Sequence, residues 1–156
     1  MTLYVRRFAV EALLVRDGKI LLSRRGPDRH GAGTWALVGG HVENGELACD
    51  ALLRELREEL GDAFADALDP AGFELASFVD DRRPSAEPPV LYVHASFVVE
   101  VPPDAEPVNA EPSLCAELSW FSTLALPAEH QLYAPHRAPL ENYLTGRIYS
   151  VVANLK

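Results

Sequence analysis

The sequence lacks long apolar runs. None of them approaches the roughly 20 residues that a membrane helix needs. The first residues, Met-Thr-Leu-Tyr-Val-Arg-Arg, also lack the charged and then apolar layout of a secretory signal. These two absences argue against a helical membrane protein and lead us to expect a cytoplasmic one.

Cysteine is scarce, with Cys49 and Cys115 as its two occurrences and no C-x-x-C pair. Two scattered cysteines are too few for a disulfide framework or for a zinc site. We expect both to be reduced and mostly buried thiols.

Positive charge is in deficit. Lys and Arg number 14 against 23 Asp and Glu, which gives a formal net charge of −9. Such a surface repels nucleic acids and anionic lipids, so we expect no nucleic-acid polymer and no membrane as partner. A small anionic substrate fits this charge only if something local reverses its sign, and bound divalent cations do so.

No internal repeat, low-complexity tract or long linker divides the chain, so we expect residues 1–156 to form one domain. Residues 7–15 read as a strand, Asp17-Gly18 as a turn and residues 19–23 as the hairpin partner. Further strands are predicted at 73–79, 90–101 and 117–121, and a last helix at 138–144, with loops at 24–34, 80–89 and 102–112. Strands before, between and after two helices favour an α/β fold with a mixed sheet and helices on its faces.

The first helix is predicted over residues 46–60. Leu52, Leu56 and Leu60 recur at i, i+4 and i+8, so that one stripe can face a core. Asn44 or Gly45 is the expected N-cap, and Gly61 is expected to end the helix.

Three carboxylates lie on this helix beside the leucine stripe. Glu55, Glu58 and Glu59 are spaced i, i+3 and i+4, so they project together within an arc of roughly 100°. Converging oxygens suit Mg²⁺, which is a hard cation. A solvated acidic face paired with arginine is the alternative, and the upstream pair Gly39-Gly40, whose backbone can approach a ligand closely, favours the metal site.

The spacing around the cluster forms a longer pattern. Gly40 is followed after five residues by Glu46, and after seven more by Arg54-Glu55-Leu56-Arg57-Glu58-Glu59-Leu60-Gly61. This pattern resembles the Nudix box and departs from it at the last position, where Asp62 replaces an aliphatic residue. Residues 31–43 resemble the approach to that box, with Val38 in place of a proline. Glu111-Pro112, followed by Trp120-Phe121, resembles the late segment of MutT-like nucleotide hydrolases.

The resemblance implies a Nudix-type α/β/α sandwich, that is, a mixed β-sheet with helices on both faces. It implies Mg²⁺, with Mn²⁺ as the alternative ion, held by Glu55, Glu58, Glu59 and the Gly39 carbonyl. Glu55 and Glu58 are then the catalytic carboxylates, with Glu58 either sharing the metal site or helping to deprotonate the attacking water. Arg54 has the family role of orienting these carboxylates, and a surface pair with Asp50 is its alternative.

Residues outside the cluster complete the candidate site. Glu111 is the candidate fourth metal ligand because it precedes the late Trp strand, and Glu100 is the alternative. Glu46 is expected to be structural. The candidate substrate ligands are Arg24, Arg25 and His41, for which solvated charge and loop shaping are the alternatives.

The other histidines and the aromatics have structural explanations. His94 is expected to be a packed residue, and His30, His130 and His136 fall in predicted loops. Aromatics at strand spacing are more often core than base-stacking residues. The four candidates for either role are Trp35, Phe97, Trp120 and Phe121.

The resemblance implies hydrolysis of a diphosphate linkage in a nucleoside diphosphate-X substrate. A nucleoside triphosphate, cut to a monophosphate and pyrophosphate, is the leading candidate. Nucleotide sugars and ADP-ribose are the alternatives within the enzyme class, and a catalytically silent nucleotide-binding regulator is the alternative outside it. Homodimers are common among the resembling proteins.

Overall fold

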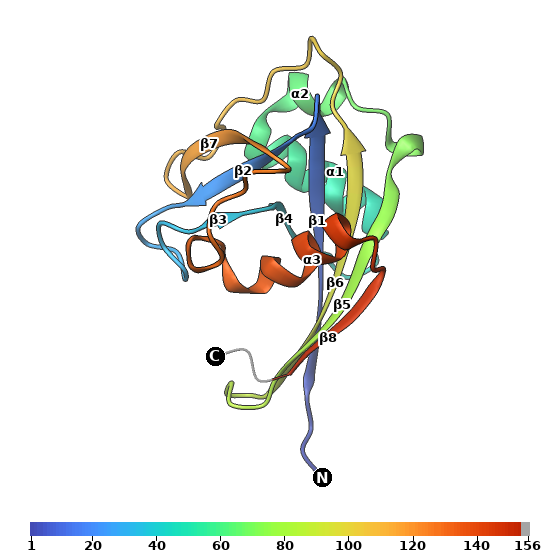
Figure 1. The fold of residues 1–156 in the computed structure, drawn as a ribbon. Helices are drawn as coiled ribbons and strands as arrows, with labels where there is room; N and C mark the ends of the chain where they lie inside the picture. Colours follow the sequence, from blue (N-terminus) through green and yellow to red (C-terminus); the bar gives the residue numbers. More distant parts are fainter. Residues whose placement is uncertain (154–156) are drawn as a thin grey trace.

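The computed structural model describes residues 1–153, and its strands join in a mixed sheet of eight strands (Figure 1). The strands are β1 (Val5–Arg16), β2 (Lys19–Arg25), β3 (Trp35–Ala36), β4 (Val38–His41), β5 (Glu74–Arg83), β6 (Val90–Glu100), β7 (Cys115–Ser122) and β8 (Tyr149–Ala153). The helices are α1 (Ala48–Leu60), α2 (Asp62–Asp66) and α3 (Ala134–Thr145), with short 3-10 turns at Pro70–Gly72 and Glu129–Gln131.

Strand β1 organises the sheet. The order is β3-β2-β1-β6-β5-β8, with β4 paired to β1 and β7 paired to β2. The predicted hairpin is confirmed at its turn, where Asp17 and Gly18 have positive φ angles of 49° and 69°. Its arms separate after two pairs, Val15↔Ile20 and Arg16↔Lys19, because β1 then pairs with β4 and β6 while β2 pairs with β3 and β7.

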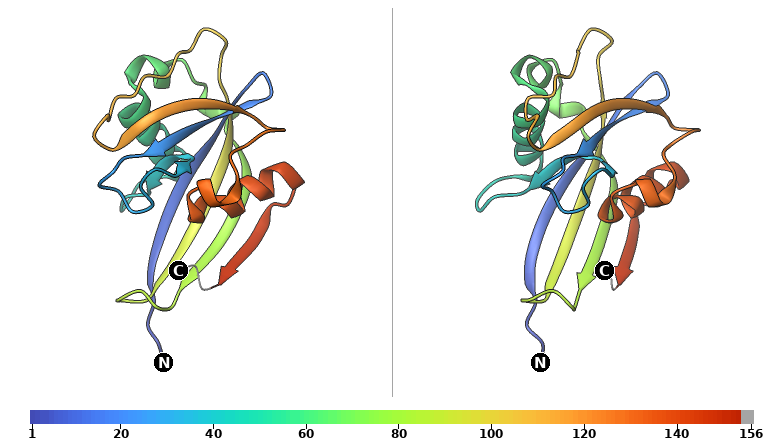
Figure 2. Two further views of the ribbon diagram at one scale, coloured as in Figure 1. Left: turned by 60° about the vertical axis from the view of Figure 1, so that its left-hand side comes forward. Right: turned by 90° about the vertical axis from the view of Figure 1, so that its left-hand side faces the viewer.

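Successive residues of β1 point to opposite faces, and a helix covers each face. On one face the core combines Val10, Ala12 and Leu14 of β1 with the stripe Leu52, Leu56 and Leu60 of α1. On the other face Leu13 packs with residues that include Leu140 of α3. Each fully buried leucine contributes about 1.5–3 kcal/mol. Figure 2 shows α1 and α3 on opposite sides of the sheet, which confirms the expected α/β/α sandwich.

Helix α1 begins later than predicted. Its N-cap is Leu47, not Asn44 or Gly45, and Glu46 precedes the helix. The reason lies in the turn before it, where the Glu43 N–H donates to the Glu46 carboxylate and the Glu46 N–H donates to the Glu43 carbonyl. These bonds hold residues 43–46 as a turn. The other end is as predicted, because Gly61 ends α1 with a φ of 93°.

Several other boundaries differ from the predictions. Strand β5 continues to Arg83, past the expected loop start at residue 80, because residues 80–83 pair with residues 90–93 of β6. Strand β2 reaches Arg25 through its pairing with β7. Helix α3 starts at Ala134, with Pro135 in its first turn. Helix α2 and strands β3, β4 and β8 were not predicted.

Cys49 is half-buried and Cys115 is buried, and both are free thiols, as expected. Within the described residues, no helix combines the length and the apolar character that crossing a membrane requires.

Candidate active site

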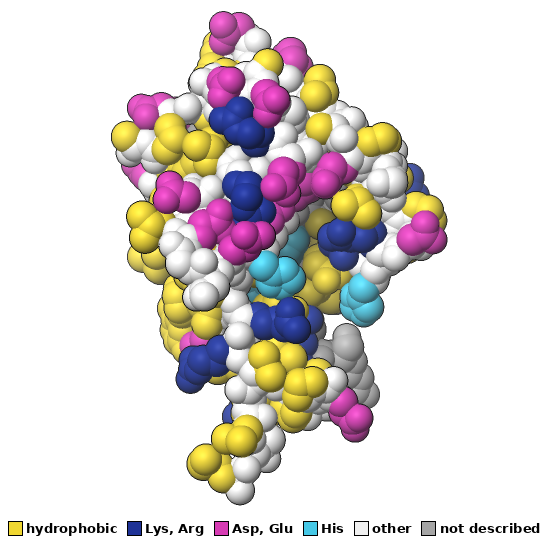
Figure 3. All heavy atoms as spheres, turned by 180° about the vertical axis from the view of Figure 1, so that it is seen from behind, with side chains coloured by type: hydrophobic (Ala, Val, Ile, Leu, Met, Phe, Trp, Pro, Cys, Tyr) yellow, Lys and Arg dark blue, Asp and Glu magenta, His cyan; other side chains and the backbone are white. Residues whose placement is uncertain are grey.

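A cavity of about 490 Å³ opens where α1, the strands β1, β4 and β6, and the start of α3 meet. Acidic side chains, among them Glu55, Glu58, Glu59 and Glu111, form part of its lining. Arginines and histidines form another part, among them Arg25, Arg83, His41 and His94. Figure 3 shows this face. Acidic side chains lie beside a hollow, a histidine lies in the hollow, and basic side chains surround it.

The two most enclosed carboxylates of α1, Glu55 and Glu59, have raised pKa values. Burial, reinforced by Glu55 and Glu111, raises the pKa of Glu59 to about 8. Burial also raises the pKa of Glu55, with Glu58 and Glu111 adding to the effect and Arg54 opposing it. Carboxylates crowded in this way favour a bound cation, since a nearby positive charge restores their ionised forms. Four carboxylates that line one cavity also supply the oxygen ligands that a divalent ion such as Mg²⁺ prefers, so the residues present fit such an ion.

The glycine pair of β4 lets the sheet approach this cluster. Gly39 has a φ of 151°, and a Cβ there would overlap the Val10 carbonyl of β1. A Cβ on Gly40 would overlap the Glu55 carboxylate. The Gly39 N–H donates to Glu59 Oε1 at 3.2 Å. Both glycines line the cavity, and the Gly39 carbonyl as a metal ligand stays a prediction.

Arg54 is held by Glu46, and Asp50 is not among its partners. Its Nε and Nη2 donate to the two oxygens of Glu46 at 2.9 and 3.0 Å. Its Nη1 donates to Glu55 Oε1 at 2.8 Å and lies 3.6 Å from Glu58, while Nη2 also donates to the His41 carbonyl. The guanidinium thus ties the turn before α1 to two carboxylates of the cluster. Glu46 lies outside the cavity lining, in keeping with a structural role.

Glu111 reaches the cluster because its loop binds the end of α1. The N–H groups of Val108 and Ala110 donate to the carbonyls of Leu60 and Glu59 at 3.1 and 3.0 Å. These carbonyls have no partner within the helix, so the loop satisfies them. Glu111 consequently lines the cavity, whereas Glu100 is exposed at the end of β6 and does not.

The structure separates the three candidate substrate ligands. Arg25 lines the cavity and stacks on the Tyr133 ring at 4.0 Å, with its Nε donating to the His30 carbonyl. His41 also lines the cavity. Its pKa is lowered, mainly by burial and secondly by the positive charge of Arg7. Arg24 lies outside the lining, where it contacts Glu117 at 3.6 Å and the Gly33 carbonyl, so the fold does not bring it to the site.

The lining includes a buried polar group that the sequence patterns did not predict. Glu11 of β1, His94 of β6 and His136 of α3 meet there. Burial disfavours the charged forms of Glu11 and His94. Their contact outweighs this effect, because His94 lowers the pKa of Glu11. Asp81 and Glu11 together raise the pKa of His94 to about 9. Burial lowers the pKa of His136 to about 4. His136 lies in a helix, so its assignment to a loop was wrong. One signal was present in the sequence, namely a single carboxylate inside the apolar run of β1.

The aromatic candidates belong to the cores. Trp35 and Phe121 stack edge to face at 4.8 Å beside the α3 core, and Phe97 and Trp120 pack on the α1 core. None of the four is among the lining residues in the described part of the chain. The aromatic rings that do line the cavity include Tyr92 and Tyr133.

Comparison with known proteins gives a family match that covers most of the chain. The model of the NUDIX domain matches residues 5–143. Among solved structures, the MutT NUDIX hydrolase of Burkholderia pseudomallei superposes with a TM-score of 0.73 and 32% identity, over 88% of this chain and 98% of that one.

Curated relatives match a shorter segment. The CTP pyrophosphohydrolase of Escherichia coli K12 is 54% identical over 52 residues, which are 33% of this chain and 38% of that protein. The nucleoside triphosphatase NudI of Escherichia fergusonii is 52% identical over 58 residues, 36% of this chain and 41% of that protein. The chain thus spans about two fifths of the length of these relatives. Together with the fold and the box, the family match decides the classification: the chain belongs to the Nudix hydrolase family and is similar to its MutT-like members.

Proposed function

We propose that the chain hydrolyses nucleoside triphosphates to a nucleoside monophosphate and pyrophosphate, using Mg²⁺ held by Glu55, Glu58, Glu59 and Glu111. In this reaction the oxygen of a water molecule bonds to one of the two phosphorus atoms that flank the α,β-bridging oxygen. The bond from that phosphorus to the bridging oxygen breaks, and the monophosphate and pyrophosphate separate. Mn²⁺ is the alternative ion. The family match supports the further proposal that residues 1–156 form one Nudix domain.

The position of Glu59 is the observation that carries this proposal. Its carboxylate is enclosed between α1 and β4, receives the Gly39 N–H, and has its pKa raised to about 8. An ionised carboxylate is unfavourable in such a place unless a cation accompanies it. A divalent ion would serve the substrate as well, because it would neutralise phosphate charge and make a water molecule more acidic.

The chain's own residues have distinct tasks in this proposal. Glu55, Glu59 and Glu111 would hold the ion. Glu58 has a half-exposed side chain, so it would either share the ion or accept the water proton. Arg54 keeps Glu55 and Glu58 in place. Arg25 and His41 are positioned in the lining to contact phosphate oxygens.

A triphosphate substrate is favoured over other diphosphate linkages by the names of the curated relatives, a CTP pyrophosphohydrolase and a nucleoside triphosphatase. Nucleotide sugars and ADP-ribose are the competing substrates within the enzyme class. A silent nucleotide-binding regulator is the competing function, although the carboxylates of the box are present.

Product analysis tests the proposal. Purified protein is incubated with Mg²⁺ and each nucleoside triphosphate, nucleotide sugars and ADP-ribose, and the products are separated. We expect a nucleoside monophosphate and pyrophosphate from a triphosphate. Release of orthophosphate alone, or cleavage restricted to nucleotide sugars or ADP-ribose, would overturn the proposed substrate. Absence of turnover with every compound would leave the regulator as the better explanation.

Two matched variants test the metal assignment. Glu59→Gln removes an enclosed carboxylate, and we expect turnover to fall at least a hundredfold, since a metal site contributes several kcal/mol to transition-state stabilisation. Glu100→Gln removes an exposed carboxylate outside the cavity and should retain wild-type turnover. Near-wild-type activity of Glu59→Gln would contradict the assignment.

A further inference from the structure

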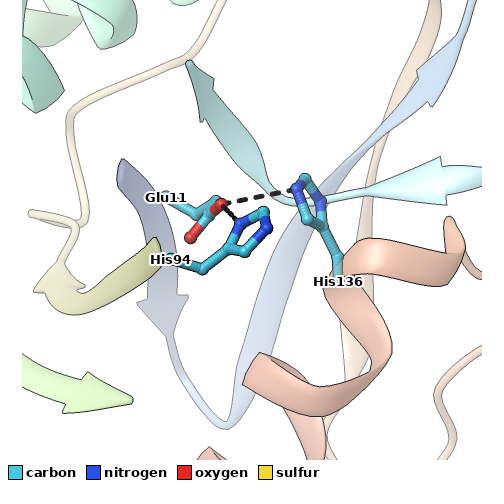
Figure 4. A group of neighbouring side chains, drawn as sticks. All are labelled: Glu11, His94 and His136. Atoms are coloured by element: carbon cyan, nitrogen blue, oxygen red, sulfur yellow. Dashed lines mark hydrogen bonds and ion pairs between the residues drawn. The ribbon is translucent and has the colours of Figure 1, made fainter. Parts of the chain in front are cut away.

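The buried polar group of the cavity has no role in the metal chemistry proposed above. Glu11, His94 and His136 come from β1, β6 and α3 and point toward one another (Figure 4). They are 1%, 3% and 8% exposed, yet all three line the same cavity as the acidic cluster. A substrate whose phosphates lie at the acidic cluster can therefore place another part of itself against this group.

The spacing of this group suits a metal ion, but its hydrogen bonds do not. One ligand atom from each residue lies within 4.8 Å of the others. The Leu37 N–H donates to His136 Nδ1 at 2.9 Å, which occupies the lone pair of that nitrogen and assigns the hydrogen to Nε2. His94 Nδ1, 2.6 Å from Glu11 Oε1, donates to a carboxylate that can only accept. A nitrogen that carries hydrogen cannot ligate a metal, so the group is built for hydrogen bonding.

Hydrogen-bonding capacity remains unused in this group. His136 Nε2–H points toward Glu11 Oε1 but lies 3.7 Å away, too far for a hydrogen bond. Glu11 accepts from His94 on one oxygen and from Ser96 on the other at 2.9 Å, and each oxygen has a second lone pair. His94 Nε2 is buried and faces Asp81 Oδ2 at 3.6 Å, so it is not part of this open capacity. The open donor of His136 and the open lone pairs of Glu11 indicate that a ligand completes the set.

We propose that Glu11 and His136 recognise the edge of the substrate's nucleobase. Glu11 accepts a hydrogen bond from an N–H of the base, and His136 Nε2–H donates to the acceptor beside it. The rings of Tyr92 and Tyr133 are also part of the lining, with Arg83 and Arg25 stacked on them, so a flat heterocycle would meet aromatic and guanidinium groups there. This assignment rests on the proposed triphosphate substrate and adds how its base is recognised. The ligand class is a nucleotide whose base carries an N–H donor next to an acceptor.

Analogues that lack the donor test the part assigned to Glu11. The preferred nucleoside triphosphate of the wild-type protein is compared with the one analogue that lacks the N–H donor of its base. The analogue carries 2-pyrimidinone if the base is cytosine, unsubstituted purine if it is adenine, and the N-methylated base if it is uracil or guanine. We expect kcat/KM to fall roughly ten- to a hundredfold, because a buried carboxylate loses its partner. Equal kcat/KM for the two compounds would overturn the proposal. Variants of Glu11 are less suitable, since its buried carboxylate also accepts hydrogen bonds from His94 and Ser96.

His136→Asn tests the donor. The Asn oxygen can take the place of Nδ1 and keep the Leu37 bond, whereas the donor at the Nε2 position is lost. We expect the preference for the nucleotide over ribose 5-triphosphate, which has no base, to fall roughly tenfold or more, mainly through KM. His130→Asn, at an exposed position outside the cavity, is the matched control and should keep that preference.

The outcomes separate this inference from the proposed function. A His136→Asn variant that melts with the wild type and keeps the full preference would overturn the role of His136. If the wild type releases pyrophosphate from ribose 5-triphosphate as fast as from nucleotides, base recognition is wrong while the proposed reaction stands. If it cleaves no triphosphate, the proposed reaction itself is wrong.

Discussion

Replacing Glu59 by Gln should stabilise the metal-free protein while it removes activity. The pKa of Glu59 is about 8 in the folded chain against 4.5 for an unperturbed carboxyl. At pH 7 the folded protein must therefore keep a proton that the unfolded chain has lost. One pKa unit corresponds to about 1.4 kcal/mol, so this costs on the order of 3 kcal/mol of folding stability. Because a glutamine amide is also buried with some loss of solvation, we expect a net gain of about 2 kcal/mol.

The sign of the pH dependence follows from proton binding. Between pH 4.5 and about 8 the folded state binds more protons at Glu59 than the unfolded state, so wild-type stability falls as the pH rises. Below pH 4.5 both states are protonated, and the advantage of Glu59→Gln should disappear. For a chain of this length, 1 kcal/mol shifts Tm by about 2–4 °C, so the variant should melt about 4–8 °C higher at pH 7.

Thermal melts in the presence of a chelator measure this difference from pH 4 to pH 8. Added Mg²⁺ should raise the Tm of the wild type more than that of Glu59→Gln, because the variant lacks a ligand for the ion. Glu100→Gln is the control, with an expected Tm within about 2 °C of the wild type. The reasoning is refuted if metal-free Glu59→Gln melts below the wild type at pH 7, or if the difference stays constant across the pH range.

Three further substitutions test the surroundings of the cluster. Glu111→Gln should raise the Mg²⁺ concentration for half-maximal activity roughly tenfold, and an unchanged metal titration would remove Glu111 from the site. Arg54→Lys should lower kcat at least roughly tenfold with little change in Tm, since an ammonium cannot reproduce the paired hydrogen bonds to Glu46; a wild-type kcat would show that orientation by Arg54 is unimportant. Gly40→Ala should weaken Mg²⁺ binding as measured by calorimetry, because the new Cβ would displace the Glu55 carboxylate, and wild-type affinity would contradict the close approach described here.

Local signals explain which parts of the fold and site were predictable. The stripe Leu52, Leu56 and Leu60 repeats within one helix, so the position of α1 and its buried face followed from periodicity. The family pattern spans residues 40–61, and it predicted Glu55, Glu58 and Glu59, whose side chains the structure brings to one cavity. Asp62, where the pattern departs, pairs with Arg57 and starts α2.

Other features depend on contacts that no local pattern reports. Glu11 and His94 are 83 residues apart and meet because β1 and β6 pair in parallel with Ala9 opposite His94. His136 joins them through the docking of α3, in which the Leu37 N–H binds its ring. The N-cap of α1 was predicted wrongly for a related reason. The Glu46 carboxylate accepts from Arg54 and from the Glu43 N–H, and these bonds hold Glu46 in the turn before the helix. Sequence periodicity carries no information about such pairings.

The docking of residues 108–110 on the last turn of α1 links two kinds of measurement. The amides of Val108 and Ala110 exchange with solvent only when they leave the carbonyls of Leu60 and Glu59. The same opening would carry Glu111 away from the other carboxylates. The rate of hydrogen exchange at these two amides therefore measures how often Glu111 is away from the other carboxylates. Mg²⁺ should lower that rate by an amount proportional to the fraction of the protein that has bound the ion.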